Sequence, residues 1–274
     1  MTSKVVSDFL SMYNRTEEEL LTPEQLESKG VFSGEKEFIE FAERDYNTDK
    51  HWTFEIKKEE CALLVIDMQE DFVNPSHPMA VPEAYRMVPR MKKMIEACRE
   101  QGVPVIFTAH NIAEDCNHGF YEFWEPIKNG AIKEGTPGAD IYSGIYPLPG
   151  ERVIRTKHAY CSFSGTDLDY VLRNLGVKTL IISGTLTNFC CESTARTGYF
   201  LNYNIVFGED INATDSALAH EATLRTMRRG FGRVMPGERI ASALKDGDAL
   251  YQEAVQARAE LKNNADDARL LRQA

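Results

Sequence analysis

The sequence predicts an α/β protein with a three-layer α-β-α architecture around a six-stranded, mainly parallel sheet. From Cys61 onward, short apolar runs rich in β-forming residues alternate with helical stretches, which is the pattern of strands joined by crossover helices. The helical stretches also carry one apolar face each, as expected of helices that pack on a sheet. The predicted strands are "CALLVID", "VPVIFTAHN", "ERVIRT", "TLIISG", "YNIVFG" and "FGRVM".

Two helices are the clearest of the connecting segments. The first is expected from about Pro82 to Gln101, because Gly102 follows it and Pro104 lies just beyond. The second is expected over about 166–175, and it ends at Gly176. Their apolar faces carry Val88, Met91, Ile95 and Cys98 in the first helix, and Leu168, Val171, Leu172 and Leu175 in the second.

The chain divides into a main domain and two extensions. We expect an N-terminal helical extension over 1–57, the α/β domain over 58–246, and a C-terminal helical extension over 247–274. The extensions are rich in charge and have narrow apolar stripes, so we expect them to clamp the main domain or a neighbouring protomer in a homo-oligomer, a dimer or a tetramer. The segment 111–149 has many glycines, prolines and aromatics; it is either a lid over the site or an insertion that packs on itself.

Composition narrows the functional classes. With 31 Lys and Arg against 42 Asp and Glu, the net charge of −11 disfavours nucleic acid as a partner and favours a small molecule. No apolar run approaches the ~18 residues of a membrane span, and the N-terminus lacks a signal-peptide core, so we expect a cytoplasmic protein. The six cysteines follow no zinc or redox spacing and are expected to be free thiols. No Gly-rich nucleotide motif is present, and no cofactor is expected.

Three reactive side chains stand at the ends of predicted strands. Asp67 ends the first strand, Lys157 ends the third, and Cys190 follows the fourth in "TLIISGTLTNFCCESTARTGY", where a helix begins. Because the carboxyl ends of parallel strands meet at one crevice, an acid, an ammonium and a thiol are predicted to form one site. The start of a helix favours the thiolate form of cysteine, which is the nucleophile.

These groups suit hydrolysis through a thioester. Asp67 would take the thiol proton, return it to the leaving amine and then activate water, while Lys157 supplies positive charge. The backbone N–H groups of Leu186 and Cys190 are candidates for an oxyanion hole. Each residue also has a structural interpretation, Cys190 as a small buried residue, Asp67 as an acidic cap and Lys157 as a surface lysine, but their joint placement favours a catalytic site.

The motifs resemble those of a known family. "LLVIDMQEDFV" with Asp67, "RTKHAYCSFSGTDLDYVLRNLGVKTLIISG" with Lys157, and "GTLTNFCCESTART" with Cys190 are similar to the isochorismatase-like cysteine hydrolases, over about 61–244. The resemblance implies a Rossmann-like topology for 58–246, an Asp67-Lys157-Cys190 catalytic triad, and a cis peptide bond between Thr185 and Leu186.

Fewer residues indicate which branch of the family, and so which class of substrate, the sequence resembles. "YCSFSGTDLD" and the run from Cys190 to Ser193 look most like members that hydrolyse ureido or carbamoyl compounds, such as ureidoacrylate, biuret or N-carbamoylsarcosine. Ala159 replaces an arginine that such members often have, which speaks against a carboxylated substrate. A nicotinamidase-like amidase is the alternative, but its metal-binding spacing is not matched by "AHNIAEDCNHGF", so His110, Asp115 and His118 are interpreted as loop residues and no metal is expected. The candidates for substrate-binding walls are Phe72, Asn111, Trp124, Tyr160, Phe163 and Phe189.

A cysteine phosphatase and a non-catalytic binding protein are the alternatives from other functional classes. "CCESTART" contains the Cys-x5-Arg pattern of a cysteine phosphatase, yet Glu192 inside the loop would repel a phosphate dianion, and Arg196 is expected to be helical. A non-catalytic binding protein would account for the extensions and the aromatic loop, but it leaves the three reactive side chains without a purpose. A cysteine-dependent amidohydrolase is the favoured prediction.

Overall fold

The computed structural model describes residues 54–115, 124–256 and 259, and in this part of the chain six strands form one sheet. All pairings are parallel, and the strand order is β3-β2-β1-β4-β5-β6. The predicted α/β fold with its six strands is therefore confirmed, and the sheet is parallel throughout. The strands are β1 Cys61–Ile66, β2 Val105–His110, β3 Arg152–Lys157, β4 Thr179–Thr185, β5 Asn204–Ala213 and β6 Gly232–Met235.

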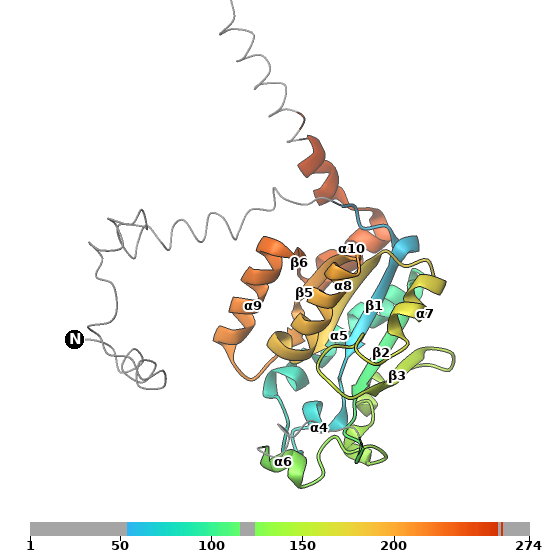
Figure 1. Ribbon diagram of the computed structural model, residues 1–274. Coiled ribbons are helices and arrows are strands. Elements are labelled where there is room, and N and C mark those ends of the chain that lie inside the picture. The colour runs from blue at the N-terminus through green and yellow to red at the C-terminus, as the bar shows by residue number, and fades with distance from the viewer. Residues whose placement is uncertain (1–53, 116–123, 257–258, 260–274) are drawn as a thin grey trace, which may run out of the picture. The chain divides into compact units, whose positions relative to one another are not determined.

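Helices cover both faces of the sheet (Figure 1). One face is packed by α5 (Pro82–Glu100) and α10 (Gly237–Asp246), and the other by α7 (Leu168–Asn174), α8 (Glu192–Phe200) and α9 (Ala217–Gly230). Two separate apolar clusters result, one on each side of the strands. The short elements are α4 Glu70–Val73, α6 Glu125–Lys128, the 3-10 turns Lys58–Glu60, Pro137–Ala139 and Ser143–Ile145, and a π-helical turn Thr187–Cys191.

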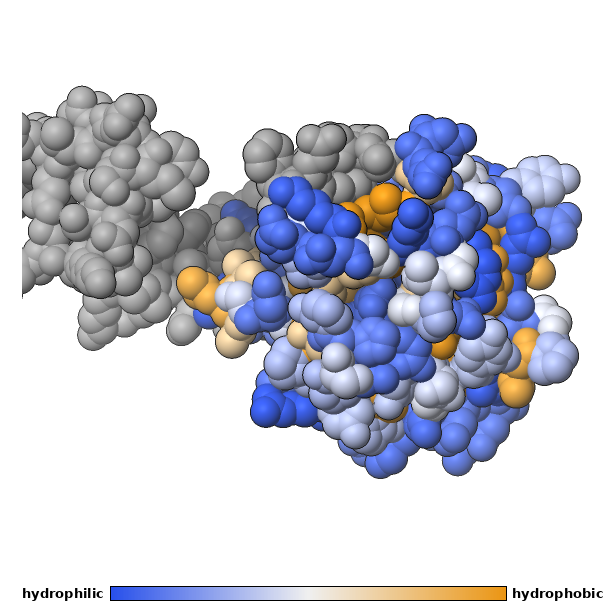
Figure 2. Space-filling model, turned by 90° about the horizontal axis from the view of Figure 1, so that it is seen from below, coloured by the Kyte–Doolittle hydropathy of each residue, from blue (hydrophilic) through white to orange (hydrophobic). Residues whose placement is uncertain are grey.

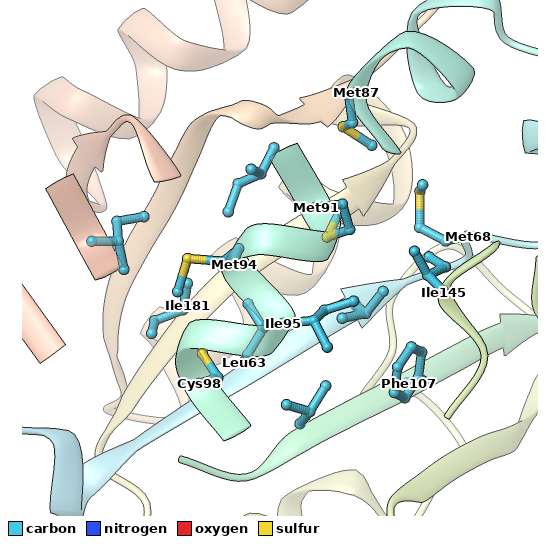
Figure 3. Packing of buried hydrophobic residues seen from close by; sticks show 14 of the residues in the cluster. Leu63, Met68, Met87, Met91, Met94, Ile95, Cys98, Phe107, Ile145 and Ile181 are labelled. Carbon is cyan, nitrogen blue, oxygen red and sulfur yellow. The ribbon is translucent and has the colours of Figure 1, made fainter. Parts of the chain in front are cut away.

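In helix α5, the residues that begin and end the helix and the apolar face that packs on the sheet can all be traced to the sequence pattern. It begins at Pro82, whose fixed φ suits the first turn, and it is followed by Gly102 at φ +69°, a conformation that glycine adopts without a Cβ penalty. Its predicted apolar face does lie on the sheet, where Met91, Met94 and Ile95 are at most 2% exposed (Figure 3). Flexible methionine side chains fill the uneven space between the helix and the strands.

The strand order places a crevice beside β1. From β1 the chain winds outward to β2 and β3, and then crosses to β4 and winds the other way to β5 and β6. At such a switch point the loops after two adjacent strands diverge, which leaves room for a ligand at their carboxyl ends. The loop after β1 starts with Asp67, and the loop after β4 leads to Cys190.

The ends of the described domain are joined by a buried ion pair. Arg233 on β6 and Asp248, just after α10, are each 1% exposed at the side chain, and an Arg233 Nη2 to Asp248 Oδ1 distance of 2.9 Å is one of their two contacts. The backbone N–H of Ile56 also donates to the Asp248 carboxylate at 2.9 Å. The segment before β1 and the segment after α10 are thus fixed to the same edge of the sheet.

The predicted extensions lie mostly outside the described residues. Helical structure continues over 249–256 at the C-terminal side, whereas 1–53 falls outside the description, so the division at residues 57 and 247 stays a prediction. Within the described ranges, no helix is long and apolar enough to span a membrane. The five described cysteines are free, as expected.

Candidate active site

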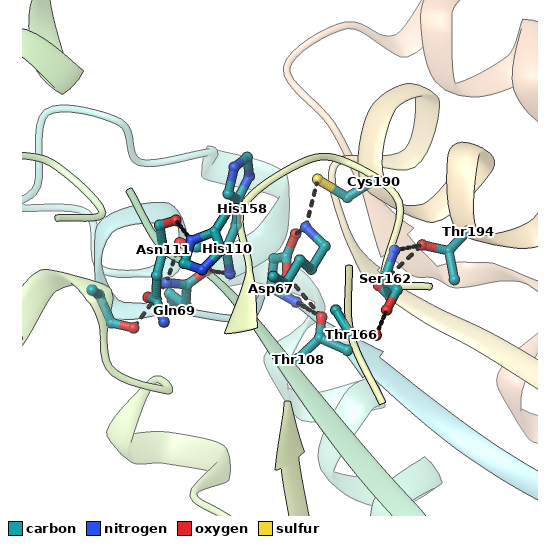
Figure 4. Close-up of polar contacts among 12 residues, drawn as sticks. Asp67, Gln69, Thr108, His110, Asn111, His158, Ser162, Thr166, Cys190 and Thr194 are labelled. Atoms are coloured by element: carbon teal, nitrogen blue, oxygen red, sulfur yellow. Dashed lines mark hydrogen bonds and ion pairs between the residues drawn. The ribbon is translucent and has the colours of Figure 1, made fainter. Parts of the chain in front are cut away.

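Asp67, Lys157 and Cys190 meet at the carboxyl ends of β1, β3 and β4. Figure 4 labels Asp67 and Cys190 in this group. Lys157 Nζ lies 2.5 Å from Asp67 Oδ2 and 3.6 Å from Cys190 Sγ. The side chains of Asp67 and Lys157 are fully buried, and Cys190 is 2% exposed. The three residues separated in sequence are thus brought into one contact, with the ammonium group between the acid and the thiol.

Local backbone structure aims Asp67 at this contact. Its φ of +50° turns the chain out of β1, in a left-handed conformation that aspartate tolerates better than most residues. Thr108 on β2 then holds both ends of the residue: its hydroxyl donates to Asp67 Oδ1 at 2.7 Å, and its carbonyl oxygen accepts from the Asp67 N–H at 3.1 Å. With Lys157 on Oδ2, both carboxylate oxygens are occupied.

Cys190 is carried by a π-helical turn rather than by the first turn of an α-helix. The N–H groups of Phe189 and Cys191 both donate to the Leu186 carbonyl oxygen, at 3.1 and 3.2 Å, and this closes a wide turn over Thr187–Cys191 before α8 begins. The preceding Thr185–Leu186 peptide bond is cis, at the position that the family resemblance indicated. The turn projects Cys190 Sγ towards Lys157.

Burial dominates the electrostatics of the thiol. It raises the pKa of Cys190, an effect that Lys157 opposes and Asp67 reinforces. The pKa of Lys157 is raised as well, because attraction to Asp67 and Cys190 outweighs the burial that would lower it. Asp67 and Lys157 form a buried ion pair, and burial favours the neutral form of the Cys190 thiol beside them. This direction is opposite to the expected effect of the helix start, which favours the thiolate.

An apolar pocket opens beside Cys190, with about 430 Å³ of space including the part open to solvent. It lies on the side where α4 and α6 follow the strands, and the surface seen from there is mainly hydrophilic (Figure 2). Four of the six residues predicted as substrate-binding walls line it, and so does Leu186. Its lining consists of Phe72, Met79, His110, Trp124, Ile127, Ile132, Tyr160, Leu186, Phe189 and Cys190.

Two predicted wall residues lie elsewhere. The Asn111 side chain donates from Nδ2 to the Arg155 carbonyl oxygen at 2.9 Å, so it bridges the ends of β2 and β3. Phe163 belongs to the core cluster on the α7-α8-α9 face, stacked on Tyr203 with ring centroids 6.0 Å apart. The segment after β2, expected to be either a lid or a self-packed insertion, contributes Trp124 to the pocket; residues 116–123 within it, with His118, lie outside the described residues.

His110 is the site residue that sequence analysis missed. It was interpreted as a loop residue, but it is the last residue of β2, is 2% exposed and forms part of the pocket wall. One of its ring nitrogens, Cys190 Sγ and an Asp67 carboxylate oxygen all lie within 4.8 Å of one another. The predicted strand "VPVIFTAHN" already included His110, but the sequence does not show which way a side chain points at the end of a strand.

The backbone of His110 is fixed by a buried glutamine (Figure 4). Gln69 Oε1 accepts from the His110 N–H at 2.8 Å, and Gln69 Nε2 donates to the His110 carbonyl oxygen at 3.0 Å and to that of Ala139 at 2.8 Å. Gln69 stands two residues after Asp67, so one short segment sets the position of the acid and of the histidine.

Asp67, His110 and Cys190 together have donor types that bind metals. They do not fit that role here, because the ammonium group of Lys157 already contacts both Asp67 and Cys190 and supplies the positive charge that a metal would bring. Asp115 is exposed and takes no part in this group. We assign no metal to these residues.

The Cys-x5-Arg pattern does not form a phosphate cradle. Arg196 lies on α8 and donates to Glu192 Oε1 at 2.9 and 2.7 Å, one helical turn away. Thr223 donates to the other oxygen of Glu192 at 2.7 Å. The arginine is thus engaged on the helix surface, as its position in the sequence predicted, and the phosphatase hypothesis has no support in this geometry.

Comparison with known proteins places this site in a family context. The family model described as the isochorismatase domain matches residues 61–239. Nicotinamidase 3 from Arabidopsis thaliana is 33% identical over 184 residues, which is 67% of this chain and 88% of that protein. A ureidoacrylate amidohydrolase from Cronobacter turicensis is 26% identical and covers 68% of this chain and 89% of its own length.

Solved structures agree in fold. A cysteine hydrolase from Pseudomonas syringae superposes with a TM-score of 0.67 at 25% identity, over 72% of this chain and 98% of that one. The N-carbamoylsarcosine amidase from Thermoplasma acidophilum gives a TM-score of 0.57 at 28% identity, over 65% of this chain and 97% of its own. In each case nearly the whole of the known structure is matched.

Proposed function

Because the chain belongs to the isochorismatase family, we propose that it is a cysteine-dependent amidohydrolase that cleaves a C–N bond of a small linear amide or ureido compound through a thioester on Cys190. One observation carries the proposal: Lys157 lies between Asp67 and Cys190 in a buried contact, and Cys190 lines an apolar pocket. An ion pair of this kind is costly to bury for stability alone, whereas a nucleophile with its base beside it requires such an arrangement.

The reaction follows from the protonation states of the site. As Sγ attacks the substrate carbonyl carbon, the thiol proton passes to Asp67, and the C–S bond forms while Lys157 offsets the negative charge. Asp67 returns the proton to the leaving nitrogen, the C–N bond breaks and the amine departs. Water then attacks the thioester, the C–S bond breaks, and the carboxylic acid leaves with the thiol restored.

The pocket supports an uncharged substrate. Its described lining contains no Asp, Glu, Lys or Arg side chain, and aromatic rings from Phe72, Tyr160 and Phe189 make up much of the wall. Ala159 stands where ureido-cleaving relatives of this kind often have an arginine. A carboxylate group on the substrate would therefore lose its hydration without gaining a cation. Neutral ureido compounds such as biuret fit this site better than ureidoacrylate.

A nicotinamidase-like amidase is the second candidate. The same aromatic, uncharged wall favours a flat neutral ring, and the Arabidopsis relative at 33% identity is named a nicotinamidase. The two candidates share the thioester chemistry and differ in the group attached to the carbonyl carbon.

The proposal is tested by measuring ammonia release from biuret, ureidoacrylate, N-carbamoyl amino acids, nicotinamide and simple amides, with the wild type and Cys190→Ala. We expect release from the neutral members of the panel, and no release above background with Cys190→Ala. Cys161→Ala is the matched control, because Cys161 donates to Thr197 Oγ1 and is absent from the pocket lining. Equal rates in wild type and Cys190→Ala would overturn the mechanism.

A further inference from the structure

We propose that His110 is the catalytic base of the second half of the reaction, in which it takes a proton from the water that hydrolyses the Cys190 thioester. The inference rests on the proposed thioester chemistry and assigns to His110 a role that sequence analysis gave to Asp67. It starts from the placement of the two residues relative to the pocket.

His110 lines the pocket, whereas Asp67 does not. Asp67 is fully buried, is absent from the pocket lining, and has both carboxylate oxygens occupied by Thr108 and Lys157. His110 forms part of the pocket wall next to Cys190. An acyl group on Sγ occupies the pocket side, where His110 is.

The transfer of a proton to the leaving nitrogen and the removal of a proton from the incoming water have different requirements. The leaving nitrogen is held near Asp67 by its covalent link to Sγ through the tetrahedral carbon. The incoming water has no such link, so a group in the wall must hold it and accept its proton. Among the described lining residues, His110 carries the one imidazole, and a ring nitrogen lies within 4.8 Å of Cys190 Sγ. A water molecule or a carbonyl carbon that enters the pocket beside Cys190 is therefore close to the imidazole.

The imidazole is also held in place. Gln69 makes hydrogen bonds to both the N–H and the carbonyl oxygen of His110, and the ring packs edge-on against Tyr160, with centroids 6.0 Å apart. A base that is fixed in this way needs little reorganisation when the water attacks. In the step itself, the water oxygen bonds to the acyl carbon, its proton moves to the imidazole, the C–S bond breaks, and the imidazolium returns the proton to the leaving sulfur.

The test uses p-nitrophenyl acetate, a neutral aromatic ester whose leaving group departs without a proton from Asp67. In His110→Gln we expect a stoichiometric burst of nitrophenolate, followed by a steady rate that is lower than that of the wild type by about 10²- to 10⁴-fold. Mass spectrometry should find an acetyl group on Cys190 in the variant. Hydroxylamine, a nucleophile that does not require a base, should restore turnover and release acetohydroxamate.

Controls separate a chemical role from a structural one. His158→Gln removes a histidine that bonds to the Asn111 carbonyl oxygen outside the pocket, and it should show no acetyl accumulation. If His110→Gln fails to fold, as judged by thermal unfolding, His110→Ala with free imidazole repeats the test, and imidazole should speed the loss of the acetyl group.

The outcomes distinguish the two proposals. Failure of the wild type to acetylate Cys190 would overturn the thioester mechanism itself. Acetylation and normal turnover in the wild type, with an unchanged steady rate in the His110 variants, would overturn the role of His110 alone. Loss of the burst together with the steady rate would also overturn it, because His110 would then act before the thioester forms.

Discussion

Lys157 is the residue on which the charges of the site depend. It contacts both the acid and the thiol, and no solvent reaches it. The ammonium group therefore offsets the charge of the Asp67 carboxylate, and it opposes the burial that raises the pKa of Cys190. A neutral thiol is the less reactive form, so we expect slow attack by the cysteine until a substrate carbonyl is in place.

Breaking this ion pair should cost stability as well as activity. In Lys157→Met, the buried Asp67 carboxylate loses its partner, so we expect the free energy of unfolding to fall by about 3–5 kcal/mol. The double variant Asp67→Asn with Lys157→Met removes both charges and should be more stable than Lys157→Met alone. Denaturant unfolding of the wild type, Asp67→Asn, Lys157→Met and the double variant checks this, and additive effects would show that the two side chains do not interact.

The raised pKa of Cys190 predicts how its alkylation depends on pH. Because the thiolate fraction rises with pH below the pKa, the rate of modification by iodoacetamide should increase steadily from pH 6 to about pH 9 without levelling off. At neutral pH it should be slower than that of a free cysteine. Peptide mass spectrometry isolates Cys190 from the other thiols. A plateau below about pH 8 would mean that Lys157 outweighs burial.

At residue scale, sequence reasoning located Asp67, Lys157 and Cys190 because each follows an apolar run. It could not place His110, Asn111 or Phe163 correctly. Whether a residue near a strand end faces the pocket, the backbone of a neighbour or the core depends on where the strand stops and on its register with the next strand. The pairing of β2 with β3 shifts between Thr108 and His110, and this irregularity has no counterpart in the residue pattern.

At the scale of elements, the contact between β1 and β4 depends on a single glycine. Gly184 has φ +126°, and a Cβ added there would lie 2.0 Å from the Ile66 carbonyl oxygen. Ile66 immediately precedes Asp67, and Gly184 precedes the Thr185–Leu186 bond. The two strands that carry the acid and the thiol are thus packed with their backbones in contact.

Gly184→Ala should therefore separate the catalytic groups. We expect it to lower the free energy of unfolding by more than about 3 kcal/mol and to remove activity, because neither backbone can give way easily. Gly176→Ala is the matched control: its φ of +71° is also positive, but a Cβ there meets nothing within 4 Å, so the cost should be about 1 kcal/mol. Thermal unfolding and amide turnover are measured for both. Equal losses would contradict the packing argument.

The strands and the longest helix were the most predictable elements. Apolar runs identified all six strands, and a proline at the start and a glycine after the end fixed α5 to within one residue at its C-terminal end. The π-helical turn was not foreseen, since a widened turn depends on which carbonyl accepts each N–H, and Leu186 accepts two of them. Strand β5 also runs to Ala213, beyond the predicted "YNIVFG", since it continues past an irregular pairing with β4.

At the scale of the whole molecule, Asp248 joins segments that are far apart in sequence. It binds Arg233 on β6 and the backbone N–H of Ile56 before β1. The side chains of Asp248 and Arg233 are each 1% exposed. The guanidinium group also donates to the Phe54 carbonyl oxygen at 3.2 Å. These contacts lie at the amino ends of β1 and β6, whereas the candidate site lies at the carboxyl ends of the strands.

Removing this anchor should weaken the fold without changing the chemistry. Asp248→Asn removes the carboxylate that contacts the buried Arg233 guanidinium, and we expect a loss of about 3–5 kcal/mol in the free energy of unfolding, with kcat nearly unchanged at low temperature. The exposed Asp246→Asn, two residues earlier, is the control and should stay within about 0.5 kcal/mol of wild type. A fall in kcat as large as that of Lys157→Met would show that loss of the Arg233–Asp248 ion pair also disturbs the active site.

The strand order also has a consequence for the newly made chain. Asp67 follows β1, His110 ends β2, Lys157 ends β3 and Cys190 follows β4, so the ribosome releases Cys190 after the other three residues. Under the proposed mechanism, a partly synthesised chain holds the base without the thiol. The proposed site is complete when the half of the sheet that is translated last packs against the half that is translated first.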